Sequence, residues 1–350
     1  MNNLVKLGWN NEVEWNEETV ARVLTIQKNS YQISDGELEY HAHLSGKFIN
    51  EAMNSLDFPA VGDWVEVQKI PDESKAVIKR VLPRKSQFVR QAAGNRTDAQ
   101  IVAANIDTIF IVNSLNHDLN VRRIERYILL AYESGATPIL LLTKKDQATE
   151  EEIDNALSSV NEVAIGIPII LISSIDGDGI EELKSHLSPG KTAALLGSSG
   201  VGKSTLINTL FGEKIQETKK IREDDSRGRH TTTHRELFLL PNGAMIIDTP
   251  GMREIQLWDG EDAIDTTFQD IGALQLECKF SDCTHTNEPG CRVQEAIEDG
   301  SLSAERYKSY VKLQREIAFE KRKQDQKAKL EEKSKWKKIS KQQKSFYKKR

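Results

Sequence analysis

The chain has 350 residues, 38% hydrophobic and 29% charged, which suits a globular protein with room for two or three domains. No window approaches the ~20 apolar residues of a membrane span, and the first residues, MNNLVKLGWNNEVEW, lack a secretory apolar core. We therefore expect a cytoplasmic protein without a membrane span. The net charge of −5 hides an asymmetry, because residues 321–350 hold 14 Lys/Arg against 3 Asp/Glu while residues 1–320 hold 34 against 50.

From about residue 19 to 82, short alternating runs such as TVARVLTI, LEYHAHLSG and VGDWVEVQKI are broken by Gly, Asp and Pro. Period-2 alternation with turn signals at this spacing predicts a small antiparallel barrel. A five-stranded barrel of the oligonucleotide-binding (OB) type is the natural interpretation, although other small barrels share the pattern.

The segment that follows is basic. Residues 75–97 hold seven Lys/Arg and no acidic residue, with Phe88 among them. The composition favours a surface that tracks phosphates and stacks a base on Phe88. A linker that is basic for solubility is the alternative.

Continuous apolar runs then alternate with helical stretches. IDTIFIVNS (106–114), PILLLT (138–143), PIILIS (168–173) and TAALLG (192–197) each resemble a buried strand, and Val121, Ile124, Ile128 and Tyr132 mark one face of a helix. Such alternation predicts an α/β domain whose parallel sheet is covered on both faces.

The fourth of these strands leads into GSSGVGKS (197–204), which fits the phosphate-loop pattern in its proper context between a strand and a helix. Its glycines let backbone N–H groups wrap a phosphate at a helix N-terminus. Lys203 is expected to neutralise the β/γ oxygens, and Ser204 to ligate Mg²⁺.

Further along, AMIIDTPG (244–251) is a buried strand that ends in D-x-x-G. Asp248 is expected in the Mg²⁺ shell, and Gly251 is expected to sense a γ-phosphate. The polar loop 226–236 between the two motifs carries Thr231, Thr232 and Thr233, any of which could ligate Mg²⁺.

The guanine reader is expected upstream of the phosphate loop. LLLTKKD (140–146) places Thr143, Lys144 and Asp146 at the carboxyl end of a strand, where open α/β sheets bind ligands. Asp146 can accept from guanine N1–H and the 2-amino group, and the Lys144 stem can cover the base. Ser173 and Ser174 fit the segment that approaches O6. Because the base reader precedes the phosphate loop, the motif order predicts a circularly permuted GTPase.

All three cysteines lie near the C-terminus, in CKFSDCTHTNEPGC. Cys278, Cys283, His285 and Cys291 supply three thiolates and one imidazole, which complete a closed tetrahedral Zn²⁺ site of the structural type. A segment with so little core would depend on that metal for folding. The helical stretch after it runs into the basic tail, which either reaches a polyanionic partner or is a solvated extension.

The order TKKD, GSSGVGKST, GRHTTT, DTPG, with a VGDWVEV barrel before it and C-x₄-C-x-H-x₅-C after it, resembles the RsgA (YjeQ) family of small ribosomal subunit biogenesis GTPases. The resemblance spans about residues 19–320. It implies a GTPase that binds the 30S subunit late in its maturation, is stimulated by it and contacts rRNA through the barrel and zinc domains. It also implies a catalytic role for His230. Met252 stands where many GTPases carry a water-orienting glutamine, which predicts slow intrinsic turnover.

We therefore expect four parts: residues 1–88 (OB-like barrel with an N-terminal extension), 89–260 (permuted GTPase), 261–320 (mainly helical zinc domain) and 321–350 (basic tail). The protein is expected to act as a monomer on GTP and 30S rRNA, with Zn²⁺ and Mg²⁺ as cofactors and no membrane partner. Thr143 replaces the commoner Asn, keeping a hydroxyl but losing the amide. The candidate GTP-binding residues are Thr143, Lys144, Lys145, Asp146, Ser173, Ser174, Gly197, Ser198, Ser199, Gly200, Val201, Gly202, Lys203, Ser204, Thr205, Asp248 and Gly251.

Two other classes of function are compatible with parts of the pattern. An RNA-binding scaffold could use GTP as a conformational ligand, in which case release from 30S would not need hydrolysis. A P-loop kinase or ATPase would make the TKKD segment accidental, and ATP would then compete as well as GTP.

Overall fold

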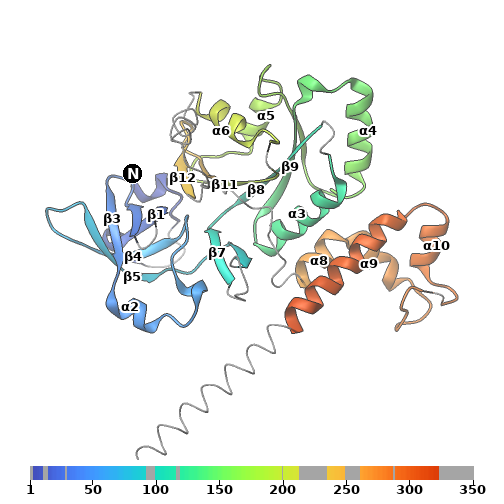
Figure 1. Cartoon of the computed structure of the whole chain (residues 1–350), viewed down its shortest axis with the longest axis horizontal. Coiled ribbons are helices and arrows are strands. Elements are labelled where there is room, and N and C mark those ends of the chain that lie inside the picture. Colours follow the sequence, from blue (N-terminus) through green and yellow to red (C-terminus); the bar gives the residue numbers. More distant parts are fainter. Residues whose placement is uncertain are drawn as a thin grey trace, which may run out of the picture. The chain divides into compact units, whose positions relative to one another are not determined.

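The computed structural model describes residues 3–10, 15–27, 30–91, 99–115, 119–198, 200–212, 235–248, 261–286 and 288–322. The chain divides into two compact units, Met1–Gln256 and Leu257–Arg350, both drawn in Figure 1. Each unit is described separately below.

The first unit begins with a closed five-stranded barrel. A short helix, α1 (Asn3–Lys6), precedes it, and the strands are paired in the order β1-β2-β3-β5-β4, with a β1–β4 pairing that closes the circle. β3 and β5 run parallel, and the other pairs are antiparallel. The strands are β1 (Val20–Gln27), β2 (Ser30–Ser34), β3 (Glu39–Leu44), β4 (Trp64–Lys69) and β5 (Lys75–Val81), with helix α2 (Gly46–Glu51) between β3 and β4.

The barrel core follows from the alternation in the sequence. Tyr40 and Ala42 of β3 are buried in the barrel core while His41 between them is exposed, and Ala76 and Ile78 of β5 are buried on either side of the less buried Val77. A one-residue slip would turn these side chains to solvent, so burial of one face fixes the register. The predicted barrel is confirmed.

An antiparallel ribbon follows the barrel, made of β6 (Gln87–Gln91) and β7 (Ala99–Ala104). Phe88 lies in this ribbon and is 2% exposed. The prediction that Phe88 lies on a base-stacking surface was wrong, because a buried ring cannot offer a face to a nucleobase.

The second part of the first unit is a sheet in the order β10-β9-β8-β11-β13-β12. All neighbours are parallel except β12, which is antiparallel to β13. The predicted parallel sheet is confirmed, and β12 was not foreseen. The strands are β8 (Thr108–Ser114), β9 (Thr137–Thr143), β10 (Ile169–Ile172), β11 (Thr192–Leu196), β12 (Glu236–Leu239) and β13 (Met245–Asp248).

Helices cover this sheet because the strands are apolar on both faces. They are α3 (Val121–Glu133), α4 (Glu150–Asn161), α5 (Ile180–Ser185) and α6 (Lys203–Phe211). Asn120 caps α3, and Thr149 and Glu152 form a capping box at α4, so both helices start where their first free N–H groups find acceptors. The parallel strands bring their carboxyl ends to one edge, which positions the site.

The second unit is helical in its described part, with α8 (Glu261–Thr267), α9 (Gln269–Leu276), α10 (Arg292–Glu298) and a helix over 304–322. Its core includes Phe268, Ile271 and Tyr310. Arg306 is 2% exposed, ion-pairs with Asp270 at 2.7 Å and covers the Phe268 ring at 4.8 Å. The small core of the second unit thus includes the ion pair between Arg306 and Asp270.

Candidate nucleotide site and metal centre

The phosphate loop joins the carboxyl end of β11 to the start of α6. A Cβ at Gly197 would lie 2.3 Å from the carbonyl oxygen of Val112, so only glycine fits against β8 there. Gly200 and Gly202 have φ values of +84° and +97°, a region that L side chains rarely adopt. The glycines let the backbone turn sharply into the helix N-terminus, whose free N–H groups suit an anion.

The loop lysine lies inside its own loop. Lys203 Nζ donates to the carbonyl oxygens of Gly197 at 2.6 Å and Ser198 at 2.5 Å. Ser204 is exposed in the first turn of α6, and Asp248 ends β13, the strand next to β11. The loop edge therefore combines an ammonium group, a hydroxyl and a carboxylate. The two oxygen donors suit a hard cation such as Mg²⁺.

The TKKD segment contacts the phosphate loop. Thr143, 3% exposed at the end of β9, donates its hydroxyl to the carbonyl oxygen of Val201 at 2.6 Å, with the Asn113 carbonyl at 3.2 Å. Lys144 follows with φ +61°, so the chain turns at once towards Asp146. The structure thus brings the two predicted motifs together, although 54 residues separate Thr143 from Gly197 along the chain.

Ser173 joins this group from the end of β10. Its buried hydroxyl lies 3.0 Å from both Asp146 Oδ1 and Asp176 Oδ2, and accepts from the Asp176 N–H at 3.1 Å. Lys145 ion-pairs with Asp178 at 2.9 Å. Asp146 is therefore oriented by the hydroxyl of Ser173, a residue that the sequence had suggested for contact with guanine O6. Asp176 and Asp178 were not anticipated.

Other predicted residues fall outside the described part of the chain. They are Ser199, His230, Thr231, Thr232, Thr233, Gly251 and Met252, together with residues 323–350 of the tail.

Sequence reasoning missed one contact of the phosphate loop. Arg123, in the first turn of α3, donates from Nη1 to the Ser198 hydroxyl at 3.0 Å. A basic residue in the first helical turn is uncommon because it opposes the helix dipole. That position was the available signal.

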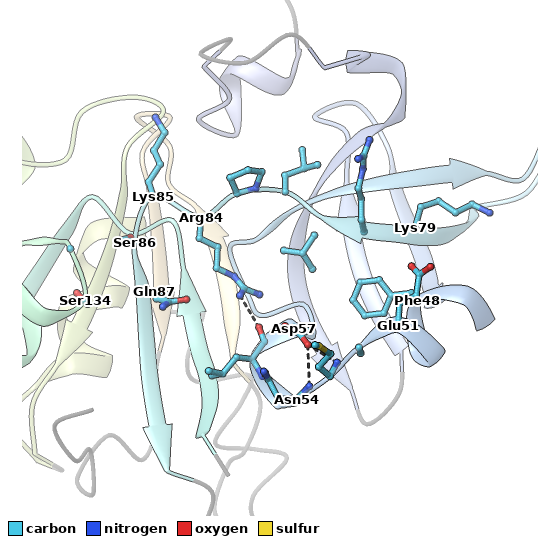
Figure 2. A pocket seen from close by; sticks show the side chains of 18 of the residues that line it. Phe48, Glu51, Asn54, Asp57, Lys79, Arg84, Lys85, Ser86, Gln87 and Ser134 are labelled. Atoms are coloured by element: carbon cyan, nitrogen blue, oxygen red, sulfur yellow. Dashed lines mark hydrogen bonds between the residues drawn. The ribbon is translucent and has the colours of Figure 1, made fainter. Parts of the chain in front are cut away.

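A basic groove lies between the barrel and the far end of α3, with a volume of about 1110 Å³. Its lining includes Lys79, Arg80, Arg84, Lys85 and Tyr132–Gly135, and Figure 2 shows Lys79 on the barrel side and Lys85 near Ser134. Arg84 binds Asp63 at 2.7 Å and backbone carbonyls, and Arg80 ion-pairs with Glu66. Lys79, Arg80 and Lys85 are exposed. The groove is a concave surface that carries these basic side chains together with the carboxylates of Glu51, Asp57 and Glu133.

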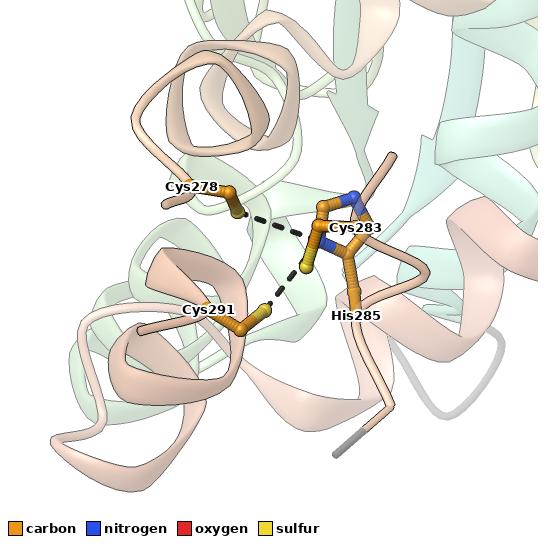
Figure 3. A group of neighbouring side chains, drawn as sticks. All are labelled: Cys278, Cys283, His285 and Cys291. Atoms are coloured by element: carbon orange, nitrogen blue, oxygen red, sulfur yellow. Dashed lines mark hydrogen bonds between the residues drawn. The ribbon is translucent and has the colours of Figure 1, made fainter. Parts of the chain in front are cut away.

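The cysteine and histidine side chains converge in the second unit (Figure 3). The ligand atoms of Cys278, Cys283, His285 and Cys291 all lie within 4.8 Å of one another, and His285 Nδ1 is 3.5 and 3.4 Å from the sulfurs of Cys278 and Cys291. A tetrahedral ion with bonds of roughly 2.0–2.3 Å separates its ligand atoms by about 3.5 Å. The cluster fits a metal ion.

The surrounding loop is shaped for this convergence. Glu288 accepts from the N–H groups of Thr284 at 3.0 Å and Thr286 at 2.9 Å, and Gln294 donates to the His285 carbonyl at 2.6 Å. These bonds hold His285 at φ +57°, a conformation unusual outside glycine. The pKa of Glu288 falls to about 2, mainly through its hydrogen bonds from Thr284 and Thr286.

A phosphate loop, a D-x-x-G strand and an upstream guanine-reader motif on a parallel sheet define a circularly permuted GTPase. The model of the RsgA GTPase family matches residues 81–258. The chain is 49% identical over 329 residues to the small ribosomal subunit biogenesis GTPase RsgA 1 of Oceanobacillus iheyensis, covering 93% of each chain. It therefore belongs to the RsgA GTPase family, and it is a GTP hydrolase.

Other relatives agree. RsgA 2 of Lactiplantibacillus plantarum is 47% identical over 91% of this chain and 90% of its own. The crystal structure of YjeQ from Thermotoga maritima superposes with a TM-score of 0.64 at 30% identity, covering 86% of this chain and 98% of that one. YloQ, titled a circularly permuted GTPase, gives 0.61 at 24% identity over 85% and 94%, and supports the fold.

An ABC transporter family model also matches, over residues 180–345. That range contains the phosphate loop, which ATPases share, but omits the TKKD segment at 143–146. Among the helices in the described ranges, none combines the length and apolar content needed to cross a bilayer.

Proposed function

We propose that this protein is a GTPase of 30S subunit maturation, which binds the subunit and its rRNA as a cytoplasmic monomer and hydrolyses GTP to GDP and phosphate faster when bound. The observation that carries the proposal is the meeting of TKKD with the phosphate loop through Thr143 and Val201, at 2.6 Å. It occurs in a chain whose full-length relatives are named for small-subunit biogenesis.

We assign the nucleotide contacts by chemistry. Asp146 accepts from guanine N1–H and the 2-amino group, Lys144 covers the base, and Ser173 and Ser174 lie towards O6. Lys145 orients this loop through its ion pair with Asp178. Asp146 needs a fixed orientation to read the base, and its contact with Ser173 supplies one.

The phosphate end is assigned in the same way. Backbone N–H groups of the phosphate loop hold the β-phosphate, with Gly197–Thr205 as the binding segment and Lys203 neutralising the β/γ oxygens. Ser204 and Asp248 take part in the Mg²⁺ shell, Gly251 senses the γ-phosphate and His230 acts in catalysis. When bound, Mg²⁺ would neutralise charge that develops between the β- and γ-phosphates.

We assign zinc to the Cys/His cluster. Three thiolates and an imidazole are soft and borderline donors that suit Zn²⁺ in a closed structural site, without a position for catalysis. The small core of the second unit makes metal binding a substantial part of its folding free energy.

For rRNA, we assign the basic groove and the barrel. Exposed Lys79, Arg80 and Lys85 contribute cations to a concave surface about 1110 Å³ in volume, which Glu51, Asp57 and Glu133 also line. The five-strand order with parallel β3 and β5 matches an OB-type barrel, which commonly presents nucleic-acid surfaces. Binding is expected to weaken as salt rises.

The test is GTP hydrolysis by the purified protein with and without 30S subunits, with ATP as the control nucleotide. The proposal predicts a large stimulation confined to GTP. Equal turnover with and without 30S would remove the ribosomal partner. Equal release from 30S with GTP and with a non-hydrolysable analogue would favour the scaffold function instead.

A further inference from the structure

Helix α3 runs from the phosphate loop to the basic groove, two places that a GTPase with a nucleic-acid partner must connect. Its 13 residues span about 20 Å. The first turn carries Arg123, which contacts the phosphate loop, and the last turn leads into Tyr132–Gly135, which line the basic groove. One rigid element therefore touches both the nucleotide site and the groove.

The nucleotide end is a specific polar contact. The Arg123 guanidinium donates to the Ser198 hydroxyl at 3.0 Å, while Lys203 donates to the Ser198 carbonyl at 2.5 Å. Ser198 is thus held from the helix by its side chain and from within the loop by its backbone. A hydrogen bond from a charged donor is stronger than a neutral one, so this contact restrains the start of the loop.

A second observation concerns Asn113, which lies beside Ser198 in the sheet register. Asn113 of β8 is fully buried, and within the described residues neither its amide nitrogen nor its amide oxygen has a hydrogen-bond partner. Ile111 of β8 pairs with Leu196 of β11, and the same register continued by two residues brings Asn113 level with Ser198. An orphaned buried amide destabilises the folded state, so its presence calls for an explanation other than stability.

The groove end is fixed to the basic segment. The Ser134 carbonyl accepts from the Gln87 N–H at 3.0 Å, and a Cβ at Gly135 would lie 3.4 Å from the Lys85 carbonyl. Figure 2 labels Ser134 beside Lys85, Ser86 and Gln87. A phosphate bound by Lys85 would therefore act close to the backbone of Gln87, which is hydrogen-bonded to the end of α3.

The body of α3 can transmit a displacement because it is packed on the sheet. Ile124, Ile128 and Leu129 are buried, and α3 packs on β8 and β9. Glu125 is also fully buried, with both carboxylate oxygens 3.0 Å from the Arg122 guanidinium. A helix held this firmly moves as a unit instead of bending.

We propose that Arg123 is a positioning residue for GTP hydrolysis, which aligns the phosphate loop through Ser198, and that α3 carries the effect of a polyanion in the basic groove to this contact. The first part builds on the GTPase activity of the chain. The second part rests on the proposed function, because it requires nucleic acid in the groove. Loop alignment matters most when charge shifts in the transition state, so it should affect kcat more than KM.

The first experiment measures intrinsic hydrolysis by the full chain. Arg123→Ala should lower kcat about tenfold and leave KM within about threefold, and Arg123→Lys should restore part of the rate. Ser198→Ala should cost a similar factor, and the double variant little more than either single one, because both remove the same bond. Additive losses, or a rise in KM at constant kcat, would overturn the positioning role.

The second experiment measures the ratio of 30S-stimulated to intrinsic turnover. The ratio should fall towards one in Arg123→Lys, which is the gentler variant. The matched control is Lys184→Gln, which removes a charge from an exposed side chain of α5 that pairs with Glu181, and it should keep the wild-type ratio. A wild-type ratio in Arg123→Lys would overturn transmission through α3. If the wild type itself shows no stimulation, the proposed function fails, and the intrinsic-rate experiment still decides the role of Arg123.

Discussion

Thr143 shows how one hydroxyl can link the base-reader segment to the phosphate loop. Thr143 is 3% exposed, and its hydroxyl donates to the Val201 carbonyl oxygen in the phosphate loop. Compared with the commoner asparagine, Thr143 lacks the amide but keeps a hydroxyl. The structure indicates that the hydroxyl retains a tether between the base reader and the phosphate loop.

We expect Thr143→Val to weaken GDP binding by about tenfold, because a buried carbonyl that loses its donor costs ~1–3 kcal/mol. The two side chains have nearly the same shape, so the fold should persist. Thr143→Ser keeps the hydroxyl and is the control. Calorimetric titration of GDP measures the effect, and wild-type affinity in the valine variant would show that the tether is dispensable.

The roles of the site residues could be predicted from the sequence to different degrees. The phosphate loop and TKKD were found from sequence because each pattern lies at the end of a buried strand, and the structure brings them into contact. Arg123 and Asp178 were missed since neither belongs to a local pattern. Phe88 was misassigned because composition cannot tell the buried face of a two-stranded ribbon from its solvent face.

At the scale of elements, alternation predicted the barrel and apolar runs predicted the parallel sheet. The β6–β7 ribbon and β12 were not predicted, since short strands with mixed burial give little periodicity. The Cys/His loop between α9 and α10 was predicted from spacing alone. Its four ligand atoms converge through backbone turns stabilised by Glu288 and Gln294, a detail that spacing does not contain.

We expect Cys283→Ser to lower bound zinc from about one ion per chain to near zero and to unfold the second unit, because the metal supplies much of its folding free energy. Metal analysis and thermal melting measure the two effects. Ser281→Ala, an exposed change in the same loop, is the control and should leave both unaltered. Full zinc content in the Cys283 variant would contradict the ligand assignment.

At the scale of the whole first unit, the barrel and the GTPase sheet share a buried arginine. Arg22 of β1 donates to the carbonyl oxygens of Leu7, Gly62 at 3.2 Å and Asn105 at 3.3 Å. It also donates to the Thr192 hydroxyl at 2.8 Å and to the Met245 sulfur at 3.0 Å. Burial lowers the Arg22 pKa to about 10, opposed by Asp107 and Asp63, so it remains charged at neutral pH.

The positions that Arg22 contacts explain why this link matters. Thr192 begins β11, which leads to the phosphate loop, and Met245 begins β13, which leads to Asp248. β12 also pairs with β1 through Glu236 and Thr25, so the barrel strands continue the GTPase sheet. The sequence could not reveal the contacts of Arg22 with the GTPase sheet, because in the alternating pattern of β1 Arg22 looks like any other polar residue that faces solvent.

We expect Arg22→Met to loosen β11 and β13 as well as the barrel, since it strands several buried acceptors that serve both parts. Amide hydrogen exchange should rise by more than about tenfold at the starts of both strands, which corresponds to a local loss of ~1.4 kcal/mol. Arg84→Met is the control, because Arg84 binds Asp63, Leu56 and Phe58 within the barrel and its approach. It should raise exchange in the barrel and leave β11 and β13 protected. Equal protection of β11 and β13 in both variants would mean that the barrel and the sheet are held together by strand pairing and apolar contacts instead of by Arg22.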